Sequence, residues 1–450
     1  MKQKIYKRKR IIPVGWKEIK LGDVFRTSSG STPLSTEKSY YEGGVIPWIN
    51  SGELASPYIY KTSNYITQKG FENSSTELYP KDTVLVAMYG ATAGKASLLK
   101  LEACTNQAIC AILPNEDYCP EFIKYNIDTL YEHLVGLSSG SARDNLSQAG
   151  LKELKLVLPK TKKEQEKLVS VLSLLDRKIE LNRQINDNLE AMAKQLYDYW
   201  FVQFDFPNEE GRPYKSSGGA MVWNDKLKRE IPKGWTSAKI KDAAHTYSGG
   251  TPTSTNSKYY DGGNIPWINS GELNNPIITS TTNYITEEGL NNSSAKLYPQ
   301  DTVLVALYGA TAGKVSLLSF EACSNQAVCG VIPQNKIMTT YIRYYLSSLY
   351  EHFITLSSGS ARDNISQDTI KNTILPIPQE KILKEYSDSV VPIISKIIAN
   401  QKEIENLTKQ RDELLPLLMN GQATVNYHLS VLFITKIMLY YKETNINFGY

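Results

Sequence analysis

The chain has 450 residues, 41% of them apolar and 21% charged, so it is long enough for two or three domains and is not extensively disordered. A formal net charge of +4 permits an anionic partner without requiring one. Five cysteines, an odd number, favour a reducing cytoplasm, and their apolar neighbours in CTNQAIC and CSNQAVC indicate buried strand thiols rather than a metal site.

The two ends of the chain differ from its middle. The basic N-terminal tail, residues 1–12, lacks the apolar core of a signal peptide, so we expect a cytoplasmic protein. An atypical C-terminal tail, residues 421–450, contains an apolar stretch that is interrupted by Asn426, His428 and Lys436. Because this stretch is marginal in length and broken by polar residues, we expect no contact with a membrane.

An internal repeat governs the organisation. The second copy follows the first at a constant offset of 219 residues (235 − 16 = 219 for the two tryptophans that open the copies). The repeated segments are WINSGEL at Trp48 and Trp267, YGATAGK at Tyr89 and Tyr308, and SSGSARDN at Ser138 and Ser357. A period of this length indicates a duplicated domain rather than a solenoid, and we place the copies at residues 13–159 and 232–378.

Each copy mixes strand and helix signals. The segment DTVLVA at residues 82–87 and 301–306 is typical of a buried strand, and residues 108–113 and 327–332 have the same character. Helices are expected near residues 120–135 and 339–354. Frequent Gly and Pro between short strands predict an α+β domain with many loops.

A long helix is predicted after each copy, at residues 160–204 and 379–420. Apolar residues there recur at alternating spacings of four and three, which is typical of a coiled coil, and we expect the two helices to pack antiparallel. Asn182 and Asn400 occupy matching polar positions in the two seams, so we expect them to meet, or nearly meet, and to fix the register. Two independent amphipathic helices are the alternative. Between the first helix and the second copy, residues 205–231 are rich in Pro, Gly and Ser and predict an exposed linker.

No motif for catalysis is found. The spacing from Gly90 to Lys95 is one residue short of a phosphate-binding P-loop, and Ala96 stands where Ser or Thr would bind Mg²⁺. Motifs of serine hydrolases, zinc proteases and dinucleotide-binding domains are absent from the sequence. We therefore predict a chain that has no catalytic residue, no metal site and no cofactor of its own.

The motifs occur in the same order twice, and a coiled-coil helix follows each copy. In this arrangement the chain resembles the specificity subunit of type I restriction–modification systems. The segments that carry the resemblance are SGSTP and SGGTP at Ser29 and Ser248, PWINSGEL, YGATAGK, SSGSARDN, and LLPLLMNGQ at the end of the second helix. The resemblance implies that each copy is a target-recognition domain for one half of a split sequence in double-stranded DNA. It also implies that the helices set the spacing and bind two methyltransferase subunits, which carry S-adenosylmethionine. Restriction and translocase subunits, which use ATP and Mg²⁺, would join that complex.

Candidate DNA-binding residues lie in the repeated loops. Arginine suits guanine and asparagine suits adenine in bidentate contacts, which points to Arg143, Asn145, Arg362 and Asn364; phosphate contact or bracing of the domain are the alternatives. Lys95 and Lys314 stand beside glycines and suit phosphate contact, or are simply solvated. Two further sets follow a tryptophan, and in each the glutamate either accepts from a cytosine amino group or stabilises a turn. These sets are Asn50, Ser51 and Glu53, and Asn269, Ser270 and Glu272.

The near-identity of the loops predicts similar half-sites, so the expected target is an interrupted, nearly palindromic sequence. The copies differ at Ala55/Asn274, Tyr58/Ile277, Tyr60/Thr279, Lys61/Ser280 and Glu77/Lys296. These differences either break the symmetry of the target or are surface drift. The competing interpretations of the chain are an orphan or non-functional DNA-binding subunit, and a coiled-coil protein scaffold without DNA binding.

Overall fold

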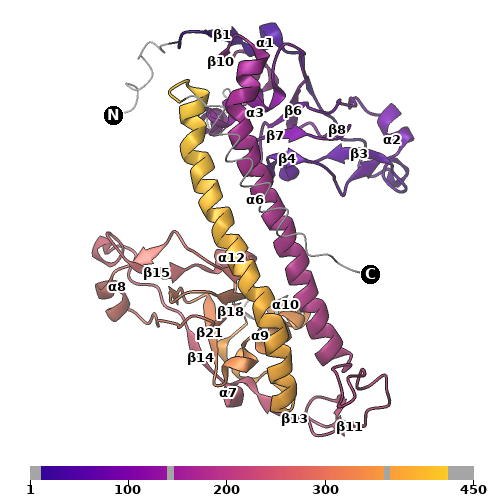
Figure 1. Ribbon diagram of the computed structural model, residues 1–450, viewed down its shortest axis with the longest axis vertical. Helices are drawn as coiled ribbons and strands as arrows, with labels where there is room; N and C mark the ends of the chain where they lie inside the picture. The colour runs from indigo at the N-terminus through magenta and orange to yellow at the C-terminus, as the bar shows by residue number, and fades with distance from the viewer. Residues whose placement is uncertain (1–11, 139–145, 359–364, 424–450) are drawn as a thin grey trace. The chain divides into compact units, whose positions relative to one another are not determined.

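The computed structural model describes residues 12–138, 146–358 and 365–423, which belong to two compact units (Figure 1). The first unit contains the chain up to Glu180 and from Asn406 onward, and the second contains Leu181–Glu405. Both long helices are divided between the units. Each unit therefore combines one copy of the repeat with a part of each helix.

The first unit has short strands and helices in the order that the repeat predicts. Its elements are β1 (Trp16–Lys20), α1 (Leu21–Val24), β2 (Thr27–Ser29), β3 (Ile46–Ile49), β4 (Tyr58–Ile59), β5 (Tyr65–Ile66), α2 (Gln68–Glu72), β6 (Val84–Ala87), β7 (Ala96–Leu99), β8 (Cys104–Thr105), β9 (Ile109–Ile112), α3 (Pro120–Asp128), α4 (Tyr131–Ser138), α5 (Gln148–Lys152), β10 (Lys155–Pro159) and α6 (Lys162–Tyr197), with single 3₁₀ turns at Lys38–Tyr40 and Ser51–Ala55.

The core of this unit is a five-stranded sheet in the order β2-β9-β6-β7-β4, accompanied by a three-stranded sheet β5-β3-β8. Strand β6 is buried along its whole length, as expected for DTVLVA, because both faces of its sheet are covered. Val84 and Val86 pack with α3 and the first turns of α6, whereas Leu85 and Ala87 pack with Ile49 of β3 on the other face. Figure 1 shows β3 and α2 on the side of the five-stranded sheet that faces away from α6.

The second unit repeats this arrangement with little change. Its elements are β11 (Met221–Asn224), β12 (Arg229–Pro232), β13 (Thr236–Lys239), α7 (Ile240–Ala243), β14 (Ala244–Ser248), β15 (Ile265–Ile268), β16 (Ile277–Ile278), β17 (Tyr284–Ile285), α8 (Glu287–Asn291), β18 (Val303–Ala306), β19 (Val315–Leu318), β20 (Cys323–Ser324), β21 (Val328–Pro333), α9 (Thr339–Ser348), α10 (Tyr350–Ser358), α11 (Gln367–Asn372), β22 (Ile374–Ile377) and α12 (Glu380–Met419), with 3₁₀ turns at Ser257–Tyr259, Ser270–Asn274 and Lys336–Met338. The sheet order β14-β21-β18-β19-β16 is that of the first unit. The predicted strands and helical regions of both copies are thus confirmed, although each helical region holds two short helices.

The cysteines confirm the prediction of buried strand thiols. Cys104, Cys110, Cys323 and Cys329 lie in strands, and all five thiols are free and buried. Burial raises the pKa of Cys104 to about 11 and that of Cys110 and Cys329 to about 12, because the thiolate loses its hydration.

The prediction of an exposed linker at residues 205–231 is wrong at both ends of that segment. Asp205, Phe206 and Ile231 are buried, and only the middle of the segment is exposed. Phe206 stacks on Trp235, with ring centroids 5.4 Å apart, and on Tyr214 at 4.7 Å. Strands β11 and β12 form an antiparallel hairpin at its end. The apolar side chains prevail over the turn-forming composition because Trp235 offers them a surface to pack on.

The long helices α6 and α12 pack against each other as an antiparallel pair. In the first unit Arg411 of α12 donates to Asp176 of α6 over 3.1 Å. In the second unit Asn182 of α6 donates to Glu403 of α12 over 2.9 Å. Residue numbers fall along α12 as they rise along α6, which confirms the predicted antiparallel coiled coil.

Asn182 and Asn400 lie within one helical turn of each other across the helix pair, but they do not bond to each other. Both side chains are buried in the helix interface, but Asn400 Nδ2 donates to Asn186 Oδ1 over 3.0 Å, while Asn182 donates to Glu403. The antiparallel register is the reason, since it sets each asparagine opposite a residue one helical turn away from the other asparagine.

Candidate nucleic-acid interface

Four loops meet at one edge of the sheets in each unit, which we call the loop edge. In the first unit it consists of residues 30–36, 50–55, 88–95 and 106–108, and in the second of residues 249–255, 269–274, 307–314 and 325–327. Strands β2 and β6 end there and β7 and β9 begin there, because these neighbours run antiparallel. The parallel pair β3 and β8 also ends there. Three of the four repeated motifs therefore converge in space, namely SGSTP (SGGTP in the second copy), WINSGEL and YGATAGK.

Backbone contacts hold these loops together. Ser31 N donates to Thr105 O over 2.9 Å, and the Thr92 hydroxyl donates to Ser51 O over 2.8 Å. Gly30 permits the close approach, because a Cβ at this position would lie 2.1 Å from Thr105 O. The same contacts recur in the second unit between Gly250 and Ser324 (2.8 Å), between Thr311 and Ser270 (3.0 Å), and at Gly249.

The predicted asparagine–serine–glutamate sets lie in 3₁₀ turns of the loop edge, but their glutamates are engaged within the domain. Glu53 Oε1 accepts from Asn50 N over 2.9 Å and from the Asn64 amide over 3.1 Å. In the second unit Glu272 Oε1 accepts from Asn269 N, Thr281 and Asn283 at 2.9, 3.2 and 3.2 Å. These contacts support the turn-stabilising alternative for both glutamates.

The two predicted lysines lie on the loop edge in different settings. Lys95 is exposed, and none of the residues that the structure describes forms an ion pair or hydrogen bond with its side-chain ammonium. Lys314 Nζ donates to Asn274 Oδ1 over 2.6 Å. The difference follows from the sequence, because the first copy has Ala55 where the second has Asn274.

Arg143, Asn145, Arg362 and Asn364 lie outside the described residues. The chain enters these segments from α4 and α10 and leaves them before α5 and α11. Gly94 of the loop edge contacts α4, since a Cβ there would lie 3.2–3.4 Å from Val135, Leu134 and Tyr131. The segment that contains Arg143 therefore begins from a helix that packs on the loop edge.

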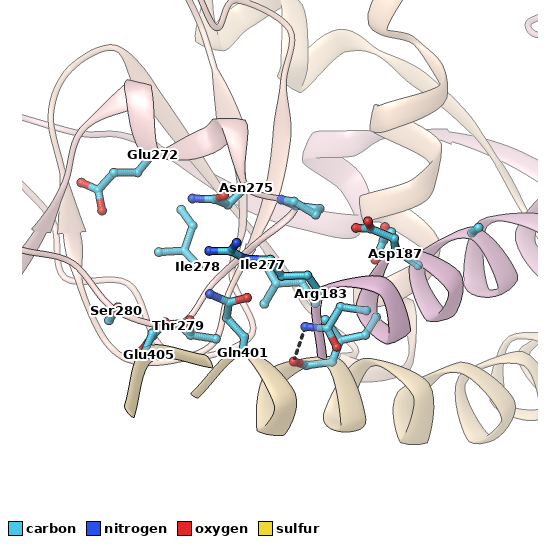
Figure 2. Close-up of a pocket in the computed structure, with 15 residues that line it drawn as sticks. Arg183, Asp187, Glu272, Asn275, Ile277, Ile278, Thr279, Ser280, Gln401 and Glu405 are labelled. Carbon is cyan, nitrogen blue, oxygen red and sulfur yellow. Dashed lines mark hydrogen bonds between the residues drawn. The ribbon is translucent and has the colours of Figure 1, made fainter. Parts of the chain in front are cut away.

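Three of the five differences named above involve residues of the second unit that face the long helices, namely Ile277, Thr279 and Ser280. A cavity of about 680 Å³ in the second unit separates the turn at Ser270–Asn274 and β16 from α6 and α12. Figure 2 shows Ile277, Thr279 and Ser280 on one side of it, with Arg183, Gln401 and Glu405 of the helices near them. The Thr279 hydroxyl donates to Glu405.

The first unit has its own version of this junction. Tyr58, the counterpart of Ile277, is buried, and its hydroxyl lies 3.0 Å from that of Tyr125. Tyr125 in turn donates to Asp176 of α6 over 2.6 Å. Tyr58 and its counterpart thus adapt each domain to the helix segments it meets.

Two exposed pairs on the loop edge were missed in the sequence. The Thr32 hydroxyl donates to the Gln107 amide oxygen, and Thr251 and Gln326 make the same contact in the second unit. The one available signal was that these exposed polar residues recur at the offset of the repeat.

Neither a cluster of metal ligands nor a membrane-spanning helix occurs in the described ranges. Within residues 12–138, 146–358 and 365–423, no three His, Cys, Asp or Glu side chains gather as metal ligands would. None of the helices in these ranges combines the length and the apolar character of a membrane span.

A duplicated α+β domain, with its loops gathered at one edge and its copies joined by antiparallel helices, defines a bivalent recognition protein. The model of the type I restriction modification DNA specificity domain matches residues 13–191 and again residues 232–410. The chain therefore belongs to the specificity subunits of type I restriction–modification systems, a non-catalytic part of these enzymes.

Individual relatives agree along nearly the whole chain. The MjaIX specificity subunit of Methanocaldococcus jannaschii is 31% identical over 92% of this chain and 95% of its own length. The HindI specificity subunit of Haemophilus influenzae is 25% identical over 90% of this chain and 99% of its own. The crystal structure of the S subunit from M. genitalium aligns with a TM-score of 0.56, covering 92% of this chain and 98% of that one; at 16% identity it supports the fold alone.

Proposed function

We propose that this chain directs a type I restriction–modification enzyme to a split DNA sequence, with one domain recognising each half. The observation that carries the proposal is the loop edge, where three repeated motifs meet in both units. Loops held on a rigid sheet are a common place for recognition residues. We assign the domains to residues 13–159 and 232–378, the helices to 160–204 and 379–420, and the connecting segment to 205–231.

The two half-sites should be nearly alike, which makes the target almost palindromic. Residues 50–54 and 89–95 are identical to their counterparts 269–273 and 308–314. Ile277 and Thr279 line a cavity with residues of the long helices, and Tyr58 is linked through Tyr125 to α6, so these differences are explained by the junction and need not alter the base preference. Half-site centres about 10 bp apart would present both halves on one side of the duplex.

We assign different roles to the candidate residues. Lys95 and Lys314 contact phosphates, Lys95 more strongly because it has no competing partner among the described residues. Polar contacts to bases come from the turns that hold the pairs Asn50/Ser51 and Asn269/Ser270, and from Arg143, Asn145, Arg362 and Asn364. Glu53 and Glu272 support these turns.

The helices are proposed to bind two methyltransferase subunits, and restriction or translocase subunits would join them. Surface for a partner exists on the helices of the second unit, where Met192, Val202 and Val391 are 46%, 48% and 46% exposed. S-adenosylmethionine, ATP and Mg²⁺ belong to those partners, and the complex would work in the cytoplasm, where DNA is found.

The weak net charge fits an assembly in which partners share the work of DNA binding. Contacts to phosphates release counterions and supply most of the salt-dependent affinity. A subunit with a net charge of +4 supplies little of it. We therefore expect weak, salt-sensitive binding by the chain alone and tight, specific binding in the complex. Equal nanomolar specificity with and without the partner would contradict this expectation.

The test is a methylome by single-molecule sequencing, with the chain co-expressed beside its cognate methyltransferase subunit and then omitted. A split adenine motif that appears only with the chain is the expected result. Its symmetry tests the proposal of similar half-sites. A soluble, assembled complex that methylates no new motif would refute the proposed function.

A further inference from the structure

An exposed hydrogen-bonded pair of side chains occurs once on each loop edge. Thr32 and Gln107 form it in the first unit, and Thr251 and Gln326 form it in the second. In both, the threonine hydroxyl donates to the amide oxygen Oε1 of the glutamine. The partners lie 75 positions apart in the sequence, so they meet only because the strand order brings β2 beside β9.

The pair stands on a firmly held backbone. The carbonyls on either side of Thr32 are both engaged, because Trp48 Nε1 donates to Ser31 O over 3.0 Å and the Tyr41 hydroxyl donates to Pro33 O over 2.5 Å. In the second unit the same contacts are made by Trp267 to Gly250 (2.9 Å) and by Tyr260 to Pro252 (2.6 Å). A fixed backbone reduces the entropy that these exposed side chains lose when they bind a ligand.

Comparison of the two copies shows that this exposed pair is the same in both, whereas three exposed positions that follow the threonine in the sequence differ. The exposed residues Leu34, Lys38 and Ser39 are replaced by Thr253, Ser257 and Lys258 in the second copy. The threonine and the glutamine are the same in both copies. Core packing does not require polar residues at exposed positions, so binding is the better explanation for their retention.

The hydrogen bond decides which chemistry the pair offers. The glutamine Oε1 is occupied by the hydroxyl, which leaves the amide Nε2 as a donor; it has no other partner among the described residues. The threonine oxygen has given its hydrogen to the glutamine and retains lone pairs as an acceptor. A donor beside an acceptor is complementary to adenine in the major groove, which offers N7 as an acceptor and the N6 amino group as a donor. Guanine offers two acceptors there and matches only the amide.

We propose that each threonine–glutamine pair recognises one adenine, at the same position of the two half-sites. Gln107 and Gln326 donate from Nε2 to N7 of the adenine. Thr32 and Thr251 accept from its N6 amino group. This inference rests on the proposed function, because it assigns specific residues of the loop edge to one A·T pair in each half of the target.

The test uses the two copies as controls for each other. Gln107→Glu replaces the amide donor by an acceptor that N7 repels, and Thr32→Val removes the acceptor at similar size. Gln326→Glu makes the first change in the other unit. Lys38→Ser, which introduces the residue of the second copy at an exposed position outside the loop edge, is the matched control. Each variant is co-expressed with the cognate methyltransferase subunit and its methylome is compared with that of the original chain.

The expected result is local and one-sided. Gln107→Glu and Thr32→Val should each lower the preference for one A·T pair in one half-site by roughly ten- to a hundredfold, the discrimination of a bidentate base contact. Gln326→Glu should change the symmetry-related position in the other half, and Lys38→Ser should keep the original motif. An unchanged motif with Gln107→Glu, a changed G·C pair, or a preference lost at several positions would overturn the inference.

A second measurement is made when the complex of a variant shows no methylation at all. The purified complex is then bound to duplexes in which each base pair of the half-site is replaced in turn. The inference requires that Gln107→Glu stops discriminating at a single A·T pair and still discriminates at the others. If the original chain itself directs no split motif, the proposed function fails, whereas a motif that is indifferent to these variants refutes only the adenine assignment.

Discussion

Removing Arg411 should destabilise the first unit and leave the second unchanged. Arg411 lies on the seam of α12, where its guanidinium donates to the Asp176 carboxylate over 3.1 Å. The Asp176 side chain is fully buried, whereas that of Arg411 is 23% exposed. Arg411→Met keeps most of the apolar stem and removes the charge, so the variant isolates the ion pair from packing.

The magnitude follows from what remains around the carboxylate. Removing one partner of a buried ion pair commonly costs about 3–5 kcal/mol, because a buried charge is left uncompensated. Here Asp176 retains the hydrogen bond from Tyr125 over 2.6 Å and the ammonium of Lys124 at 4.0 Å. We therefore expect a loss of about 2–3 kcal/mol, which is roughly a thirty- to hundredfold increase in the unfolded population. Adding Asp176→Asn to Arg411→Met removes the stranded charge and should recover at least half of that loss.

The buried cysteines provide the assay. Three thiols lie in the first unit and two, Cys323 and Cys329, lie in the second, so alkylation followed by mass spectrometry reports the opening of each unit separately. Arg411→Met should accelerate alkylation in the first unit by the factor above and leave Cys323 and Cys329 at the original rate. Lys409→Met, an exposed change two residues away, is the control and should alter neither unit. Unchanged thiols in the first unit, or equal acceleration in both units, would refute the assignment of this ion pair.

Three further predictions test other parts of the structure. Because burial raises the pKa of Cys110 and Cys329 to about 12, the unfolded thiols ionise first, so stability should fall as the pH rises above about 9; a urea midpoint that is equal at pH 8 and pH 10 would contradict this. Glu53→Ala should lower the stability of the first unit by about 1–2 kcal/mol in a thermal melt and keep the methylated sequence, whereas a changed base would assign the carboxylate to DNA recognition. Phe206→Ala should expose residues 205–231 to trypsin at a protease concentration that leaves the original chain intact, and equal resistance would show that the stacking on Trp235 does not hold this segment.

The elements of the fold could be predicted where the pattern is local. The run Val84–Ala87 is apolar at every position, which indicates a strand buried on both faces, and the spacing along α6 and α12 indicates a helix pair. The linker could not be predicted in the same way. Its Pro and Gly content is typical of an exposed loop, but Phe206 finds Trp235, and a composition count does not show which aromatic ring has a partner.

The candidate site was harder to predict because it depends on contacts between distant residues. The sequence showed which loops recur, but that they share one edge follows from the strand order β2-β9-β6-β7-β4. The hydrogen bond between Thr32 and Gln107 depends on the same order. The hydrogen-bond partners of Asn182 and Asn400 depend on the register of the two helices. A register that differs by one turn from a direct pairing gives each asparagine another partner.

The loop edges of the two copies are similar, whereas the side-chain contacts between each domain and the long helices have diverged. In the first unit Lys124 and Tyr125 face Asp176, on the helix that follows their own domain. In the second unit the counterpart of Lys124 is Arg343. Its guanidinium donates over 2.6 Å to Glu190 of α6, the helix that precedes its domain.

An exchange of whole domains would therefore leave charged side chains at the helix junction without their partners and would lower the stability of the protein. An exchange of loop-edge residues alone would leave both junctions intact. If the loop edges recognise DNA as proposed, we expect changes on each loop edge to alter its half-site independently, provided that the residues contacting the helices stay with their own domain.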